Sequence, residues 1–429
     1  MMGSSTIVDV PARRGWWARF GVPWFARLMV VTFSAQFISS AIRPLITYEA
    51  LAAGAGVVQV GIITAAYSVL ALFVAVPFGK AIDRRGETGF LLLGGFLVCA
   101  ALTSLFAPAN LILLAVGSAL LGLGHLVLVV ASQTVIAKGS RPDLRETRFA
   151  TLTTVNSIAQ IIAPAMTGFL VGAVSTGDGT ATTHVPNGHV VVVVALGMAT
   201  TATFTAISLR FRPGTLRNRS TPQNSGGRGG FMTVLRLPAV PTAILSSLTV
   251  LTAIDLLGAY LPVFGQAHGL SAGTVGLLLA TEGLAAMVVR LGMLRLIVRF
   301  TRRRLLVASM VLAATGLAVV PLTGLLDRPE AALYGLMVLI GLGLGVGQPA
   351  AMAWVAAQTP VDLRGTAVSI RLSGNRLGQI VVPLATGALA GSLGLAVAFW
   401  SPAVLLLVSA LSVFRTPADR ATETTQAGR

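Results

Sequence analysis

Charged side chains are scarce in this sequence: Asp, Glu, Lys and Arg together make up 10% of its 429 residues, whereas 55% of the residues are hydrophobic. A soluble protein of this length could not cover its surface with so few charges. The composition therefore excludes a soluble enzyme or binding domain as the bulk of the chain. A mean hydropathy of +0.84 indicates that a lipid bilayer is the solvent for most of it.

Cysteine and histidine are also rare. The single cysteine, Cys99, lies in an apolar run, so no disulfide can form within one chain. The four histidines are scattered, and the sequence has no metal-ligand cluster, no nucleophile triad and no glycine-rich phosphate loop with its lysine. We therefore expect no metal, no cofactor and no enzymatic activity. Energy for any transport would come from an ion gradient or from the gradient of the substrate itself.

Acidic residues are fewer than half as common as basic ones, and the formal net charge is +17. With the N-terminus in the cytoplasm, all but two of the 31 basic residues fall in cytoplasmic segments or near cytoplasmic helix ends, the exceptions being Arg43 and Arg328. This positive-inside bias predicts that both termini are cytoplasmic, and it explains the charge without a nucleic-acid partner. Lysine is nearly absent beside abundant Ala, Gly and Val, which favours a bacterial source and the inner (plasma) membrane as the location.

Long apolar runs recur along the whole chain, and each is long enough for a transmembrane helix of roughly 20 residues. The sequence therefore predicts an all-α integral membrane protein with twelve transmembrane helices. We place them at about 26–48, 57–79, 89–108, 110–136, 150–173 and 190–210, then at about 240–264, 273–297, 305–325, 332–358, 367–391 and 395–415.

The second half of the chain repeats the first with an offset of 219 residues. Twelve identities fall between residues 143–172 and residues 362–391, where about two are expected by chance. They include the pairs Asn156/Asn375, Gln160/Gln379, Pro164/Pro383 and Gly168/Gly387. Two duplicated six-helix bundles around a central cavity are therefore predicted.

The predicted organisation has five parts. They are an N-terminal segment at 1–25, a first half at 26–211, a cytoplasmic linker at 212–238, a second half at 239–415 and a cytoplasmic tail at 416–429. In the first part, Trp16, Trp17, Trp24 and Phe25 are interleaved with arginines, which is typical of a segment that lies at the level of the lipid headgroups.

The segment from Pro77 to Gly86 reads PFGKAIDRRG and resembles the loop signature of major facilitator superfamily transporters, Gly-x-Leu-Ala-Asp-Arg-x-Gly. The matching positions are Gly79, Asp83, Arg84 and Gly86. The resemblance implies that these residues lock the cytoplasmic side through close packing, helix capping and a tight turn. Glu87 and Thr88 stand where the family usually has basic residues, so the charge network of this loop is altered here.

Within that superfamily the chain is most similar to bacterial drug and metabolite exporters. The resemblance implies a monomer that moves a small organic compound by alternating access, and export in exchange for protons is the leading hypothesis. Proton-coupled uptake of a metabolite is the alternative. From a different class, a non-transporting membrane receptor or a lipid-handling scaffold would also fit the sequence.

Ionisable side chains inside a membrane are costly, by roughly 2.5 to 3.5 kcal/mol each on insertion scales. Asp255 and Glu282 lie at similar depths in predicted helices 7 and 8, and a carboxyl group removed from water retains its proton more readily. We expect Asp255 to be the proton-coupling or gating acid, with Glu282 as the second candidate. Arg43 lies at a similar depth in helix 1, and we expect it to pair with Asp255 and close the outer gate. The alternative is an ion pair that only holds the helices together.

Polar residues in other predicted helices are candidates for the substrate cavity. The expected set is Arg376, Asn375, Gln379, His125, Asn156 and Gln160. Arg376 could contact an anionic or polar group of the substrate, or a carboxylate of the other half. His125 could relay protons or form a hydrogen bond to a neighbouring helix. Arg371 lies close enough to the inner interface to extend its charge into the headgroups.

Overall fold

The computed structural model describes residues 23–85, 87–105, 110–140, 142–172, 188–209, 233, 236–237, 239–326, 330–359 and 364–416. The first half of this part of the chain contains α1 (Pro23–Ala52), α2 (Val57–Arg85), α3 (Glu87–Ser104), α4 (Leu111–Gly139), α5 (Pro142–Gly172) and α6 (Gly188–Leu209). The second half contains α8 (Ala239–Ala267), α9 (Ala272–Arg299), α10 (Arg302–Val319), the 3-10 helix η2 (Val320–Leu325), α11 (Glu330–Gln358), α12 (Arg364–Leu393) and α13 (Val397–Arg415).

The described part of each predicted apolar run falls mainly in one of the twelve α-helices of the described chain, so the all-helical fold is confirmed. Nine of these helices are long and apolar enough to cross a membrane. Shorter apolar stretches occupy α3 and α6, within Gly89–Ser104 and Val191–Thr200. The remaining helix, α12, is not among the nine because polar side chains, including Arg371 and Arg376, interrupt its apolar sequence.

Two helices extend well beyond their predicted ends. α2 continues to Arg85, so the motif residues Gly79, Asp83 and Arg84 belong to the last turns of a helix and not to a loop. α5 begins at Pro142, eight residues before the predicted start, with proline in the first turn, where its missing N–H costs nothing. Hydropathy marks the apolar span, whereas the helix continues into polar sequence. The side chains of the motif, and Gly86 itself, lie outside the described residues.

The start of α1 differs from the prediction of a headgroup segment up to residue 25. The helix already begins at Pro23, and the side chains of Trp24 and Phe25 are buried in the core of the first half. The guanidinium carbon of Arg148 on α5 lies 4.8 Å from the Trp24 ring centre and 5.2 Å from that of Phe25. These two aromatic side chains therefore pack between α1 and α5 and do not face the lipid headgroups. Trp16, Trp17, most of the predicted linker and most of the predicted tail lie outside the described residues.

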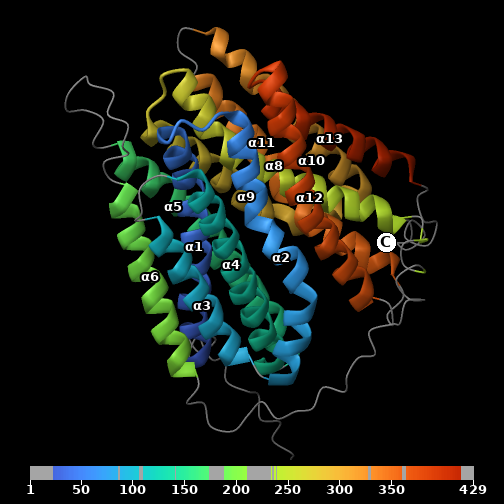
Figure 1. The fold of residues 1–429 in the computed structure, drawn as a ribbon. Helices are drawn as coiled ribbons and strands as arrows, with labels where there is room; N and C mark the ends of the chain where they lie inside the picture. The colour runs from blue at the N-terminus through green and yellow to red at the C-terminus, as the bar shows by residue number, and fades with distance from the viewer. Residues whose placement is uncertain are drawn as a thin grey trace, which may run out of the picture.

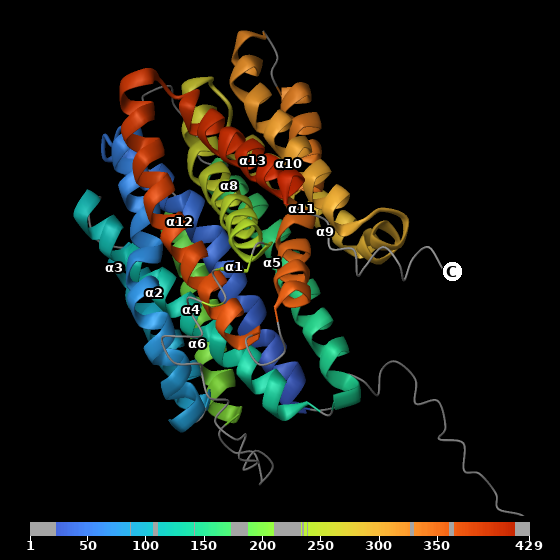
Figure 2. The same ribbon diagram turned by 90° about the vertical axis from the view of Figure 1, so that its right-hand side faces the viewer.

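The helices gather into two groups, which Figure 1 shows as the blue-to-green helices α1–α6 and the yellow-to-red helices α8–α13. Each group has its own large cluster of buried apolar side chains, and Val60 of α2 joins the cluster of the second group. The groups meet most extensively where α2 packs on α12 and α5 packs on α9, and α1 also contacts α8. Both views place α12 beside α2 (Figures 1 and 2).

Paired glycines bring the two groups together at one end of the bundle. A Cβ atom at Gly61 of α2 would lie 2.7 Å from the carbonyl oxygen of Pro383 and 3.0 Å from the Cα of Gly387 on α12. On α9, a Cβ atom at Gly276 would lie 3.0 Å from the Cα of Gly168 on α5. We call the end at which α2 and α9 begin, and at which α5 and α12 finish, the glycine-contact end. Here the two halves touch backbone to backbone.

Candidate functional site

An ion pair joins the two halves between α1 and α8. Arg43 Nη1 lies 2.7 Å from Asp255 Oδ1, and the two side chains are 26% and 5% exposed. Because α1 and α8 are the first helices of the two duplicated halves, this contact connects equivalent elements. The expected pairing of Arg43 with Asp255 is therefore present in the structure, whereas its gating role stays a prediction.

The second carboxylate oxygen of Asp255 also has a partner. The amide Nε2 of Gln379 on α12 donates a hydrogen bond to Asp255 Oδ2. The amide oxygen of the same glutamine accepts from Arg376 Nη1 at 3.0 Å and from the Ser68 hydroxyl of α2 at 3.2 Å. Gln379 thus connects the ion pair to a second arginine and, through Ser68, to the first half.

Tyr67 of α2 extends the network into the first half. The Arg43 guanidinium carbon lies 4.8 Å from the centre of the Tyr67 ring, a favourable cation–π arrangement. The tyrosine hydroxyl lies 2.8 Å from the Ser39 hydroxyl and 2.8 Å from Nδ1 of His125 on α4. The predicted hydrogen bond from His125 to a neighbouring helix is therefore present, and its partner is Tyr67.

The network contains two guanidinium groups and one carboxylate. Among the residues that the structure describes, Asp255 is the one acidic group in electrostatic contact with Arg43 or Arg376. Two buried polar atoms lack a hydrogen-bond partner. One is Nε2 of His125, a member of the network, and the other is Oδ1 of Asn375, the residue before Arg376. Excess positive charge and unsatisfied polar atoms are features of a site that binds a polar ligand.

Not every candidate residue joins this network. Glu282 has Arg290, eight residues further along α9, as its electrostatic partner, and its own carbonyl oxygen packs against Gly341 of α11. The backbone oxygen of Gln160 on α5 would lie 3.7 Å from a Cβ atom at Gly283 of α9. The structure therefore places Glu282 and Gln160 where α9 packs on its neighbouring helices, and within the described residues neither belongs to the Asp255 network.

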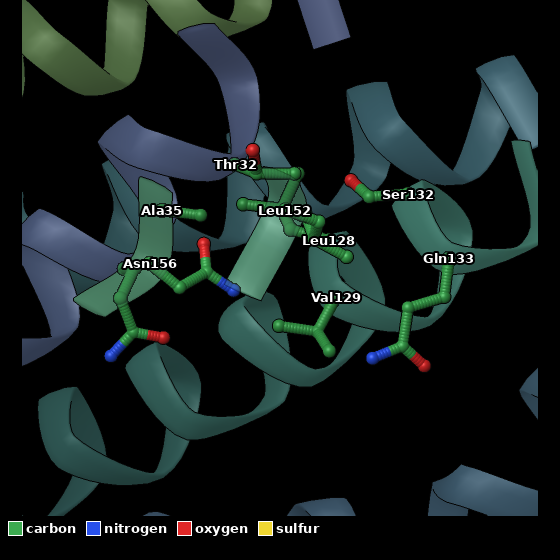
Figure 3. A pocket seen from close by; sticks show the side chains of 9 residues that line it. Thr32, Ala35, Leu128, Val129, Ser132, Gln133, Leu152 and Asn156 are labelled. Atoms are coloured by element: carbon green, nitrogen blue, oxygen red, sulfur yellow. The ribbon is translucent and has the colours of Figure 1, made fainter. Parts of the chain in front are cut away.

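Asn156 lines a small pocket within the first half (Figure 3). The pocket is formed by Thr32, Ala35 and Gln36 of α1, Leu128, Val129, Ser132 and Gln133 of α4, and Leu152 and Asn156 of α5. None of these side chains carries a charge. Ser132 Oγ and Asn156 Oδ1 are buried without a hydrogen-bond partner, so the pocket offers neutral hydrogen-bonding groups only.

Two other arginines turn inward, and for Arg371 the predicted reach into the headgroups is wrong. Arg290 of α9, one of the basic residues that the charge count places near cytoplasmic helix ends, donates to the Ser157 hydroxyl of α5 and to the Gly345 carbonyl oxygen of α11, both at 3.2 Å. Arg371, expected to reach the headgroups, is buried and donates to the Ser247 hydroxyl at 2.8 Å. Helical spacing alone does not reveal these inward directions, because a long side chain at a helix end can turn either way.

A sequence model of the Major Facilitator Superfamily matches residues 28–329 and, in a second match, residues 243–429. The chain belongs to the Major Facilitator Superfamily. Its members and its structural neighbours are transporters and not enzymes, so the chain is a multi-pass membrane transporter. The resemblance of the segment 77–86 to the superfamily signature is thereby confirmed at the level of the family.

Two proteins of Mycobacterium tuberculosis, each named an uncharacterized MFS-type transporter, are 31% identical to the chain over 170 residues. The match covers 38% of this chain and 39% of each relative.

Among solved structures, the nucleoside transporter NupG superposes with a TM-score of 0.72 at 12% identity, covering 92% of this chain and 98% of that one. The inward-open xylose transporter XylE from E. coli superposes with a TM-score of 0.71 at 13% identity, covering 93% and 96%. At these identities the likeness concerns the fold alone.

Proposed function

We propose that the protein is a proton-coupled secondary transporter of a small organic compound, with Asp255 as the proton-binding group. The observation that carries the proposal is the ion pair between Asp255 and Arg43, which links the two halves across α1 and α8. Removing the partner of a buried charge costs about 3 to 5 kcal/mol. Separation of the halves is therefore unfavourable while Asp255 is charged, and a proton on Asp255 removes most of this cost.

The charge pattern supports an orientation for this cycle. If the termini are cytoplasmic, as the positive-inside bias predicts, the glycine-contact end faces outward. The transporter described above is then closed to the outside, with Arg43 and Asp255 joined. In the opposite state α1 and α8 separate at that end, and Asp255 becomes accessible to protons from outside.

The direction of substrate movement depends on how the substrate and the proton affect each other. A cationic substrate would compete with the proton for Asp255, which favours export in exchange for protons, as the resemblance to exporters suggests. An anionic substrate would bind better once Asp255 is neutral, which favours movement together with protons. The excess positive charge beside Asp255 supports the second candidate.

The proton role can be tested in proteoliposomes that contain the purified transporter and a pH-sensitive dye. A panel of small anionic, neutral and cationic compounds is added one at a time, with a proton gradient imposed. We expect at least one compound to change the rate of proton movement, and we expect Asp255→Asn to abolish this change. Glu282→Gln is the matched control, because it neutralises a buried acid outside the network.

Two outcomes would contradict the proposal. One is proton movement that persists unchanged in Asp255→Asn. The other is a loss in Glu282→Gln as complete as that in Asp255→Asn, because a general effect of removing membrane carboxylates would then explain both variants.

A further inference from the structure

Arg376 shares the single carboxylate of Asp255 with Arg43, and it has few hydrogen bonds of its own. A guanidinium group has five N–H donors, and the one acceptor that the structure gives Arg376 is the neutral amide oxygen of Gln379. Arg43 has the Asp255 carboxylate and the Tyr67 ring, and Arg290 bridges two helices. Arg376 is partly exposed, so a ligand can reach its free donors.

The surrounding groups do not compensate both guanidinium charges of the network. Facing Arg376 and Asp255 are Arg43 from α1, Tyr67 from α2 and His125 from α4. With a neutral histidine, the network carries one net positive charge. An unneutralised guanidinium within a membrane bundle is costly, and intramembrane charges of this kind mark substrate or ion pathways.

We propose that the transported compound carries an anionic group, a carboxylate or a phosphate, that binds to Arg376. This inference rests on the proposed function and specifies its substrate class. Carboxylates and phosphates match the planar donors of arginine and form two parallel hydrogen bonds with it. A single negative charge at this position brings the network to zero net charge.

The same geometry links anion binding to protonation. A proton on Asp255 removes the one negative charge of the network and releases Arg43 from its ion pair. Both changes strengthen the attraction for an anion, and by linkage the bound anion favours protonation of Asp255 equally. The anion and the proton therefore bind cooperatively, which makes them move in the same direction.

The first test compares two Arg→Gln substitutions in the ligand-free transporter by thermal unfolding in detergent. Arg376→Gln removes an uncompensated charge and keeps a hydrogen-bonding amide, so we expect the unfolding temperature to stay constant or rise. Arg43→Gln leaves Asp255 without its ion-pair partner, so we expect the unfolding temperature to fall. A fall of similar size in both variants would show that Arg376 is a structural residue, and it would overturn the proposal.

The second test uses acetate, the smallest organic carboxylate that offers both oxygens, against acetamide of the same shape. Binding is measured from the concentration dependence of the unfolding temperature. We expect acetate to stabilise the transporter more than acetamide does, and Arg376→Gln to weaken acetate binding by roughly 10- to 100-fold. Effects of acetate as a salt that do not involve the site act equally on the parent transporter and on Arg376→Gln, so the difference between these two proteins reports binding at the site. Equal stabilisation by acetate and acetamide, or equal acetate binding with and without Arg376, would contradict the anion site.

The pH dependence separates this inference from the proposed proton role. From about pH 8 to about pH 6, where acetate stays ionised, we expect acetate to bind more tightly as the pH falls. In Asp255→Asn we expect tight binding at every pH. If acetate binding needs Arg376 but its affinity does not change with pH, the anion site is preserved and Asp255 as the proton-binding group is contradicted. Proton movement that needs Asp255, in a transporter that does not bind acetate, would preserve Asp255 as the proton-binding group and contradict the anion site.

Discussion

Replacing Gly61 by alanine adds one methyl group at a close backbone contact between α2 and α12. The added Cβ atom would lie 2.7 Å from the Pro383 carbonyl oxygen and 3.0 Å from the Gly387 Cα, whereas ordinary contacts begin at 3.4 Å. The two backbones are therefore too close by about 0.7 Å. Backbone atoms within two packed helices cannot move aside individually, so relief requires the helices to separate.

The cost falls on the joined state alone. Inserting a methyl group into a well-packed contact costs about 1 to 3 kcal/mol. In a state with the glycine-contact end open, the same methyl group faces no backbone of the other half. We therefore expect Gly61→Ala to shift the ratio of open to closed states by about 5- to 150-fold towards the open state.

Distances between two spin labels report this shift. Because Cys99 is the single cysteine, a Cys99→Ser background permits selective labelling at Ala53→Cys and Gln266→Cys, beside the first and the second half of the glycine-contact end. We expect a second, longer distance population in Gly61→Ala. Gly335→Ala is the matched control, since a Cβ atom there meets nothing within 4 Å. Identical distance distributions in Gly61→Ala, Gly335→Ala and the parent would refute the reasoning.

Two further predictions concern hydrogen bonds of the buried networks. Tyr67→Phe keeps the ring beside Arg43 but removes the hydroxyl that bonds to Ser39 and His125, so we expect the free energy of unfolding to fall by about 1 to 3 kcal/mol. Unfolding by denaturant measures this loss, with Tyr334→Phe as the control. An unchanged unfolding midpoint in Tyr67→Phe would contradict the prediction. For the bond between Arg290 and Ser157, a double-mutant cycle of Arg290→Ala and Ser157→Ala is expected to give a coupling energy of about 0.5 to 3 kcal/mol. Additive effects would mean that this bond contributes nothing.

Much of the fold could be predicted from the sequence because lipid imposes a simple rule on it. Each membrane helix must be long and apolar, so twelve apolar runs indicate twelve helices. The predicted helix ends are most in error where a helix continues into polar sequence, as at Arg85 and Pro142. The contact of Arg43 with Asp255 was also predictable, because opposite charges at equal depth in duplicated helices have few other partners.

The remaining contacts could not be predicted because they depend on which way a side chain turns. Tyr67 and Ser68 are adjacent in α2, yet one bonds to the first half and the other to the second. Glu282 lies at a depth similar to that of Asp255 but in a different helix, and its partner is an arginine of that helix. Depth follows from counting residues, whereas the facing helix and the rotation about each axis do not.

The internal repeat distinguishes the residues that close the glycine-contact end, which are the same in both copies, from the charged residue proposed to bind the ligand, which is present in one copy. Pro164 and Gly168 of α5 contact Gly276, and their repeats Pro383 and Gly387 of α12 contact Gly61, so identical residues in both copies form both backbone contacts of the glycine-contact end. The charged position Arg376 has the neutral Ser157 as its repeat. Symmetry-related contacts need the same small residues twice, because both must close together. A single ligand needs one charged site, so the two copies could diverge there without loss of closure.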